Sequence, residues 1–282
     1  MTPGRGYRIF IHAAALVASV VILAPFGWLI YTSLVGPNDV SSVPLHWWPE
    51  HWTLARYRDI FAGRQNSVAA EFRSAVVNSI IVASGTVLIS LVVGVLGGYA
   101  LARLKFPFRR ASLMSFLVTY MLPPITLIIP LYILMSRFGL LDTKIGLIIV
   151  YCSLAVPFAL WTMSNFFSTL PLELEEAARV DGCSRLGALV RVILPLSRPG
   201  IIATALFAFL LCWDEFLYSL IFTSTSQAKT IPVAIAEFTG RNAVDFGLIA
   251  AGGIIASIPP LLLTLALQRY LIGGLSSGAV KG

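Results

Sequence analysis

Charged residues are scarce in this chain. Asp, Glu, Lys and Arg make up 12% of its 282 residues, while hydrophobic residues reach 57% and the mean hydropathy is +0.86. Soluble domains carry about 25% charged residues, so this composition excludes an ordinary soluble protein and indicates a lipid environment. The formal net charge is +7, but the basic residues form no patch with interleaved aromatic residues, which argues against a nucleic-acid partner.

Residues that carry metal or covalent chemistry are also few. The three cysteines, Cys152, Cys183 and Cys212, have neither CxxC spacing nor a paired framework, and there are only three histidines. We find no HExxH pattern and no paired carboxylates beside a nucleophile. The sequence therefore predicts no disulfide, no metal site and no catalytic site.

A nucleotide-binding P-loop is missing as well. The glycine-rich stretch GGLSSGA at residues 273–279 lacks the GxxxxGK[ST] pattern, because Ala279 stands where the lysine is required. No ATP or other cofactor is therefore expected on this chain.

Long apolar runs, by contrast, are abundant. Six runs are long enough for a bilayer-crossing helix, which needs about 20 residues. They cover residues 9–34, 75–100, 111–134, 145–167, 199–222 and 246–268. The first run exceeds the apolar part of a secretory signal, about 7–15 residues, and is expected to remain as an anchor. The predicted fold is all-α, with residues 1–282 forming a single polytopic membrane domain of six transmembrane helices.

Lysine and arginine are unequally divided between the loops. With the N-terminus inside, twelve of them lie on the inner side and eight on the outer side. Because basic residues accumulate in cytoplasmic loops, both termini, the charged loop 169–198 and the tail 269–282 are expected in the cytoplasm.

The first outer loop is rich in tryptophan. It contains HWWPEHW followed by the amphipathic stretch TLARYRDIF. Trp47, Trp48 and Trp52 fit either an interfacial aromatic belt or a docking surface for an external partner.

Proline interrupts the third, fourth and sixth apolar runs. Proline removes a backbone donor, and the freed carbonyls are tolerated in lipid where neighbouring helices or cavity water satisfy them. The kinks therefore favour helices that surround a pathway, although packed bundles contain them too. The prolines are Pro123, Pro124, Pro130, Pro157, Pro259 and Pro260.

The loop between the fourth and fifth runs concentrates charge. Residues 173–180 predict a short helix in which Glu175 pairs with Arg179 at i,i+4. Gly182 suits the left-handed position after that helix. Ser184 can cap a second helix that runs to about Ile193.

The second helix is expected to be amphipathic. Its predicted apolar side consists of Leu186, Leu189, Val190 and Ile193. From the residues alone, the two helices form either a hairpin lying on the inner membrane surface or a rigid knob that a cytoplasmic protein grips.

The row EAARVDGCSRLGALVRVILP resembles the EAA motif of importer-type ATP-binding-cassette permeases. Val192 in place of isoleucine is the one departure from the motif. The resemblance implies that this loop is a coupling helix seated in a cleft of an ATPase subunit, where Glu176 would contact the ATPase and Gly182 would set the angle between the helices. The residues expected to couple are Glu176, Ala177, Ala178, Asp181, Gly182, Leu194 and Pro195.

Two further stretches resemble carbohydrate importers of this family. The row 213–216, WDEF, is similar to their WNEF element, with Asp214 where asparagine is usual. The ending QRYLIGGLSSGAVKG resembles the tail of the second permease subunit of maltose-type importers. The resemblance implies that the tail contacts the ATPase dimer through Gly278, Ala279, Val280, Lys281 and Gly282, whereas an untethered terminus is the alternative.

The resemblance implies a permease that forms half of the path for a di- or oligosaccharide. Its partners would be a second homologous permease, two ATPase subunits that hold ATP and Mg, and an extracytoplasmic solute-binding protein. The alternatives are a permease for a glycerophospho-compound, and an ion-coupled secondary transporter, which would not need an EAA hairpin.

Asp214 and Glu215 are the only acidic residues within the six runs. Charges at membrane depth usually face the bundle interior or a watery cavity. We expect at least one of the two to line the sugar path and to accept hydrogen bonds from sugar hydroxyls, although adjacent residues cannot share one helix face. The alternative is a structural tie to the other permease or to a kinked backbone. Further candidates for the path are Trp213, Asn165, Tyr120 and Tyr151.

Overall fold

The computed structural model describes residues 5–36, 49, 51–62, 68–239 and 245–279. Trp47, Trp48 and residues 280–282 of the tail lie outside this part of the chain. Within it the secondary structure is helical, apart from one isolated bridge between Val35 and Trp52. The helices are α1 (Arg5–Leu34), α3 (Ala55–Ala62), α4 (Val68–Arg103), α5 (Arg109–Met121), α6 (Pro124–Arg137), α7 (Lys144–Thr169), α8 (Glu173–Val180), α9 (Arg185–Ala188), the π-helix η1 (Leu189–Ile193), α10 (Leu194–Leu196), α11 (Arg198–Trp213), α12 (Leu217–Phe222), α13 (Ile231–Glu237) and α14 (Phe246–Ala279).

The described residues contain four helices that are long and apolar enough to cross a membrane: α1, α4, α7 and α14. Two helix pairs meet the same criterion together but are bent, by 96° between α5 and α6 and by 77° between residues 185–196 and α11. Counting each bent pair as one span gives six. The predicted all-α polytopic fold is confirmed.

The third apolar run was predicted as one spanning helix kinked at its prolines, and in the structure it is broken into two helices. Helix α5 ends at Met121 and α6 begins at Pro124. Leu122 and Pro123 both have extended backbone, with ψ of 131° and 130°. Each precedes a proline, and the proline ring disfavours the helical conformation of the residue before it. The helices α7 and α14, in contrast, continue through Pro157 and through Pro259 and Pro260.

The chain divides into two compact units. The first comprises Met1–Arg73 and Ala234–Ile258, and the second Ser74–Val233 and Pro259–Gly282. In the first unit, the buried Arg56 of α3 donates through Nε to both carboxylate oxygens of Asp245, at 3.1 and 3.2 Å, and through Nη1 to the backbone carbonyl of Val35. Arg56 thereby connects α3 with the chain just after α1 and just before α14.

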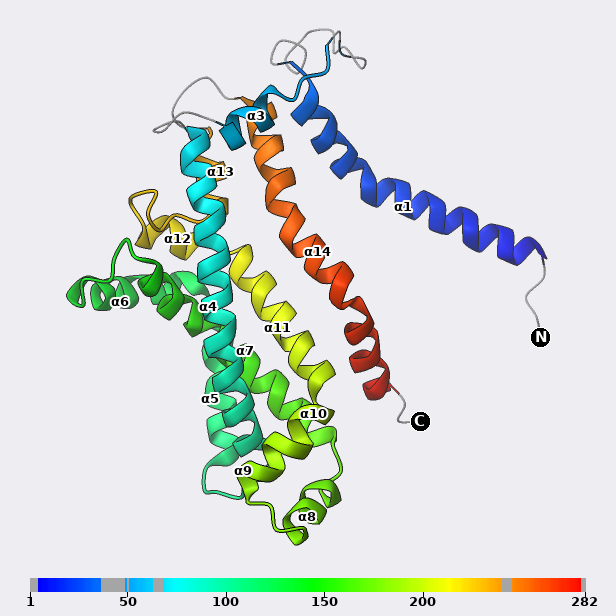
Figure 1. Ribbon diagram of the computed structural model, residues 1–282, viewed down its shortest axis with the longest axis vertical. Coiled ribbons are helices and arrows are strands. Elements are labelled where there is room, and N and C mark those ends of the chain that lie inside the picture. Colours follow the sequence, from blue (N-terminus) through cyan, green and yellow to red (C-terminus); the bar gives the residue numbers. More distant parts are fainter. Residues whose placement is uncertain (1–4, 37–48, 50, 63–67, 240–244, 280–282) are drawn as a thin grey trace. The chain divides into compact units, whose positions relative to one another are not determined.

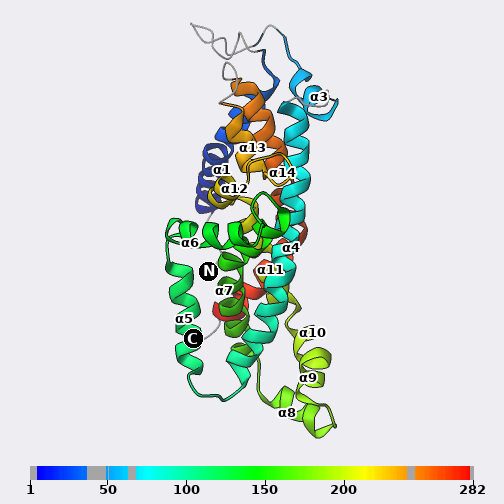
Figure 2. The same cartoon turned by 90° about the vertical axis from the view of Figure 1, so that its left-hand side faces the viewer.

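In the second unit, α4, α7 and α11 lie beside one another (Figures 1 and 2). Small residues let the α4 backbone approach α7 closely. A Cβ at Gly94 would lie 2.8 Å from Cβ of Ala159, and a Cβ at Gly98 would lie 2.9 Å from the backbone nitrogen of Ser164. Helices α8, α9 and α10 lie at one end of this unit, between the end of α7 and the start of α11 (Figure 1).

Asp142 joins two loops of the second unit. Its carboxylate accepts hydrogen bonds from the backbone nitrogens of Ser224 and Thr225, at 2.9 and 3.0 Å, and from the Thr225 hydroxyl at 2.7 Å. Burial by itself would raise the pKa of the Asp142 carboxyl, but these hydrogen bonds together hold the pKa below its ordinary value. The ionised carboxylate therefore fastens the α6–α7 loop to the α12–α13 loop.

Candidate functional site

The candidate site is the segment formed by α8, α9 and η1, residues 173–193, which we call the EAA segment. Helix α8 occupies the predicted residues, and Gly182 follows it with a left-handed φ of 85°. The backbone nitrogens of Gly182 and Cys183 donate to the carbonyls of Arg179 and Ala178, at 3.1 and 3.0 Å. This pairing is a Schellman motif, and it confirms the predicted end of the first helix.

The second helix begins as the sequence predicts. The Ser184 hydroxyl accepts a hydrogen bond from the backbone nitrogen of Gly187 at 3.1 Å, so Ser184 is the N-cap. A Cβ at Gly182 would meet no atom within 4 Å. A larger residue at position 182 is therefore restricted by the left-handed backbone angle and not by contact with neighbouring atoms of the chain.

Helix α8 divides its residues between two faces. Glu175 and Ala178 are buried, whereas Glu176, Ala177, Arg179, Val180 and Asp181 are exposed. Ala178, one of the residues expected to couple to the ATPase, packs against its own chain. The exposed part of the EAA motif on α8 is thus Glu176 and Ala177.

Glu175 does not form the predicted ion pair with Arg179. Its Oε1 accepts a hydrogen bond of 2.6 Å from the hydroxyl of Tyr99 on α4, and its Oε2 lies 3.9 Å from Nε of Arg103. Arg103 also donates through Nη2 to the carbonyl of Leu170 at 2.8 Å. A single sequence gives no signal for this contact, since Tyr99 and Arg103 are more than seventy positions before Glu175 in the chain.

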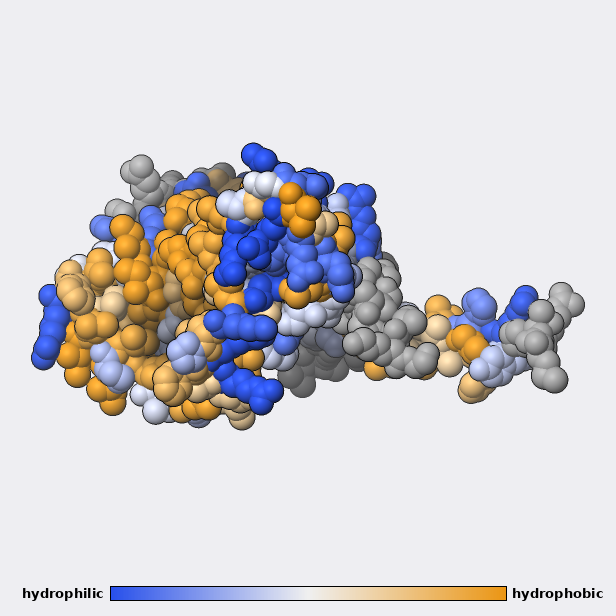
Figure 3. Space-filling model, turned by 90° about the horizontal axis from the view of Figure 1, so that it is seen from below, coloured by the Kyte–Doolittle hydropathy of each residue, from blue (hydrophilic) through white to orange (hydrophobic). Residues whose placement is uncertain are grey.

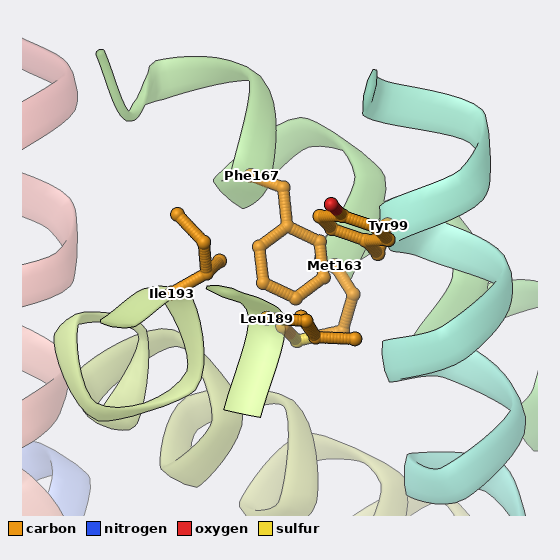
Figure 4. Close-up of a cluster of buried hydrophobic side chains, with 5 residues drawn as sticks. All are labelled: Tyr99, Met163, Phe167, Leu189 and Ile193. Carbon is orange, nitrogen blue, oxygen red and sulfur yellow. The ribbon is translucent and has the colours of Figure 1, made fainter. Parts of the chain in front are cut away.

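The π-helix η1 is anchored in an apolar cluster of five side chains. Leu189 and Ile193 point between α4 and α7, where they meet Tyr99, Met163 and Phe167 (Figure 4). All five are at most 6% exposed.

The apolar side predicted for this second helix is partly wrong. Leu186 and Val190 are 62% and 53% exposed. Val190 lies in the π-helical turn, which holds more residues than an α-helical turn and changes which side chains share a face, whereas Leu186 lies before it, in α9.

The remaining motif residues lie at the base of the segment. Leu194 of α10 is half-buried against the apolar cluster, and Pro195 is exposed. The outward surface of the segment is mixed in character. Viewed from below, hydrophilic residues gather over the region of α8 and α9, and hydrophobic residues cover the neighbouring surface (Figure 3).

The WDEF stretch breaks the fifth apolar run, which was predicted as one helix over 199–222. Helix α11 ends at Trp213 and α12 begins at Leu217. The Glu215 carboxylate accepts hydrogen bonds from the backbone nitrogen of Tyr218, at 2.9 and 3.1 Å, and from that of Ser219 at 3.2 Å. Glu215 thus provides acceptors for backbone N–H groups in the first turn of α12 and is a structural tie to the broken backbone. Asp214, in contrast, is exposed.

The other candidates for the solute path are not brought together. Trp213 and Tyr151 are buried, at 3% and 1% exposed, and the Tyr151 hydroxyl donates to the backbone carbonyl of Glu215 at 3.3 Å. Tyr120 and Asn165 are exposed on α5 and α7. Asp214, Tyr120 and Asn165 are therefore the candidates whose side chains are accessible.

The acidic, histidine and cysteine residues form no metal site in the described part of the chain, where no group of three such side chains could hold an ion.

In the tail, α14 extends past the predicted end of the sixth span to Ala279. Gly278 and Ala279 are therefore helical, whereas Val280, Lys281 and Gly282 lie outside the described residues.

Helices long and apolar enough to span a membrane, together with an exposed two-helix segment at the end of one unit, define a polytopic membrane protein. Residues 72–276 match the family described as "Binding-protein-dependent transport system inner membrane component", and the chain belongs to this family of ABC transporter permeases. It is therefore a multi-pass membrane component of a transport system and not an enzyme. Membership also argues against the ion-coupled secondary transporter.

Individual relatives agree with this assignment along almost the whole chain. A trehalose transport system permease of Mycobacterium tuberculosis is 40% identical over 92% of this chain and 93% of its own length. A trehalose/maltose transport system permease of Thermococcus litoralis is 33% identical over 98% of this chain and 97% of its own. Among solved structures, a bacterial ABC transporter that imports alginate has the same fold, with a TM-score of 0.76 at 21% identity, covering 96% of this chain and 99% of that chain.

Proposed function

We propose that this chain is one permease subunit of an ATP-driven sugar importer, and that the EAA segment transmits force to it from a separate ATPase. The observation that carries the proposal is the division of α8 into a buried and an exposed face. Glu175 and Ala178 fix the helix to the bundle, while Glu176 and Ala177 remain available to another protein. Because one face of α8 is fixed to the bundle, a movement of the ATPase that displaces the exposed face would be transmitted to the bundle.

The proposed partners follow from the family and from the lack of a nucleotide site in the sequence. Two cytoplasmic ATPase subunits would bind ATP and Mg, and a second homologous permease would complete the solute path. An extracytoplasmic binding protein would deliver the solute. This arrangement places both termini in the cytoplasm, in agreement with the excess of lysine and arginine on that side.

The proposed solute is a di- or oligosaccharide. The relatives named above are permeases for trehalose or for trehalose and maltose, and the neighbouring structure belongs to an importer of the polysaccharide alginate. We propose that Asp214 accepts hydrogen bonds from sugar hydroxyls, because it is exposed at a helix break and its neighbour Glu215 is occupied by backbone groups. Tyr120 and Asn165 are weaker candidates for contact with the sugar.

The tail is proposed as a second contact with the ATPase. Because α14 is helical as far as Ala279, it would present Gly278 and Ala279 from the end of a helix, with Val280, Lys281 and Gly282 following. The permease would then contact the ATPase subunits through two regions, the EAA segment and the tail.

The test is to reconstitute the chain with its partner subunits and measure ATP hydrolysis and solute uptake. A disaccharide such as trehalose or maltose, presented on the binding protein, should stimulate hydrolysis and be taken up. Stimulation by a glycerophospho-compound alone would replace the proposed solute class. Uptake that continues after ATP depletion and stops when the ion gradient is collapsed would contradict the proposal.

A further inference from the structure

A buried polar contact joins the EAA segment to α4, which forms the second span. The side chains of Arg103 and Glu175 are 6% and 9% exposed, and Tyr99 is 6% exposed. Three polar groups therefore lie out of water where α8 meets α4. Buried polar and charged groups are normally retained only with partners.

The partners of this contact are arranged asymmetrically. The Tyr99 hydroxyl donates to Oε1 of Glu175 at 2.6 Å, a short hydrogen bond to a carboxylate. In the described structure, Oε2 of Glu175 and Nε of Arg103 have no hydrogen-bond partner and lie 3.9 Å apart. A relative movement of about 1 Å between the two side chains would bring them within hydrogen-bond distance.

The contact closes one side of the apolar cluster. Tyr99 packs edge-on against Phe167, with ring centroids 6.1 Å apart, while its hydroxyl reaches Glu175. Arg103 meanwhile holds the carbonyl of Leu170, in the connection between α7 and α8. The same two residues of α4 therefore touch the end of α7, the first helix of the EAA segment and, through Tyr99, the cluster that contains η1.

We infer that Glu175 anchors the EAA segment to the second span, with Tyr99 and Arg103 as its positioning partners. Movement of α8 is then passed directly to α4, in addition to α7 and α11, which are joined to the segment by the chain itself. The inference rests on the proposed function, because it assigns a role within the coupling of an ATPase to this permease.

The first test is hydrogen–deuterium exchange of the α8 amides in the full chain, in lipid nanodiscs. Loss of the anchor lets α8 open locally, so Tyr99→Phe and Glu175→Ala should each speed exchange about tenfold. The double variant should exchange no faster than Glu175→Ala alone, because both changes remove one contact. Glu175→Gln keeps the acceptor for Tyr99 and should lie between the wild type and Glu175→Ala.

Two matched variants serve as controls. Glu173→Gln changes an exposed carboxylate on the same helix, and Tyr132→Phe removes a hydroxyl from α6. Tyr132→Phe should leave exchange in α8 unchanged, and Glu173→Gln, which removes one charge from the first turn of α8, should change it by much less than tenfold. Unchanged exchange in Tyr99→Phe and Glu175→Ala would overturn the inference.

The second test is the number of solute molecules imported per ATP in the reconstituted transporter. Tyr99→Phe and Glu175→Ala should lower this ratio several-fold while the ATPase subunits still co-purify with the permease. If these variants show faster amide exchange in α8 but import as much solute per ATP as the wild type, the contact has a purely structural role and the inference is overturned. If the wild-type chain binds no ATPase, the proposed function itself fails, while the exchange experiment still reports whether Glu175 anchors α8.

Discussion

At the scale of residues, Gly182 and Glu215 owe their identity to backbone geometry. Gly182 has open space around it but a positive φ, a backbone angle that residues other than glycine adopt only at a cost in free energy. Glu215 uses its carboxylate to bind the backbone nitrogens at the start of α12, and its neighbour Asp214 is left exposed. The two positions therefore respond to substitution in different ways.

Substitution of Gly182 should follow backbone preference and not side-chain size. Gly182→Ala should destabilise the turn by about 1 kcal/mol, and Gly182→Asn should be milder because asparagine visits the left-handed region more readily. Co-purification of ATPase subunits should therefore fall in the order Gly, Asn, Ala. Equal recovery with alanine and glycine at position 182 would show that the left-handed turn is unimportant.

Substitutions of Glu215 and Asp214 should affect different properties, the first the stability of the chain and the second solute transport. Glu215→Ala leaves the first turn of α12 without its acceptor and should cost about 1–2 kcal/mol, seen as a lower Tm of the purified chain. Asp214→Ala should leave Tm unchanged and reduce uptake. The opposite pattern, with Asp214 controlling Tm, would contradict the assignment of the two carboxylates.

At the scale of elements, breaks in the helices and ties between loops shape the second unit. Consecutive prolines separate α5 from α6, and the WDEF stretch separates α11 from α12. Short helices such as α12, with six residues, are marginal by themselves and depend on tertiary contacts. The loop that follows α12 is fastened by Asp142, whose three hydrogen bonds all go to Ser224 and Thr225.

The Asp142 tie should make stability depend on pH in the acid range. The hydrogen bonds hold the folded pKa of this carboxyl below its ordinary value of 3.8, against the opposing effect of burial. Its stabilisation is therefore complete above that value and is lost as pH falls through the folded pKa. Asp142→Asn should lower Tm at neutral pH, and the difference from the wild type should begin to shrink below about pH 4 and vanish only below the folded pKa.

The exposed Asp59 of α3 provides the control for this pH experiment. Asp59→Asn should follow the wild-type Tm at every pH. A constant difference in Tm between the wild type and Asp142→Asn from pH 7 to pH 3 would contradict the role of the ionised carboxylate.

At the scale of the whole molecule, the distribution of charge predicts which parts face the cytoplasm. Twelve basic residues belong to the proposed inner side, which includes the EAA segment, and eight to the proposed outer side, which includes α3. This distribution predicts that the EAA segment, the proposed contact with the ATPase, lies on the side where ATP is found.

Labelling of introduced cysteines should reveal this orientation. Val180 in α8 is 87% exposed and Phe61 in α3 is 63% exposed. A membrane-impermeant maleimide should label Phe61→Cys in intact cells and should label Val180→Cys only after the membrane is opened. Wild-type protein corrects for the native cysteines, and labelling of Val180→Cys from outside would reverse the proposed topology.

The sequence alone determined the helical class, the approximate spans and the local geometry of the EAA segment. These features depend on neighbours in the chain: runs of apolar residues, the left-handed preference of Gly182 and the capping hydroxyl of Ser184. Local periodicity failed in the second helix of the EAA segment, where Leu186 of α9 and Val190 of η1 are exposed.

Only the tertiary structure decided which charges are buried and what they contact. Glu175 was paired with Arg179 by sequence spacing, yet it reaches Tyr99 on a helix more than seventy positions earlier in the chain. The choice between Asp214 and Glu215 likewise required the break between α11 and α12. The physical reason is that the cost of burying a charge depends on partners from distant segments, and the order of residues in a single chain does not show which segments meet.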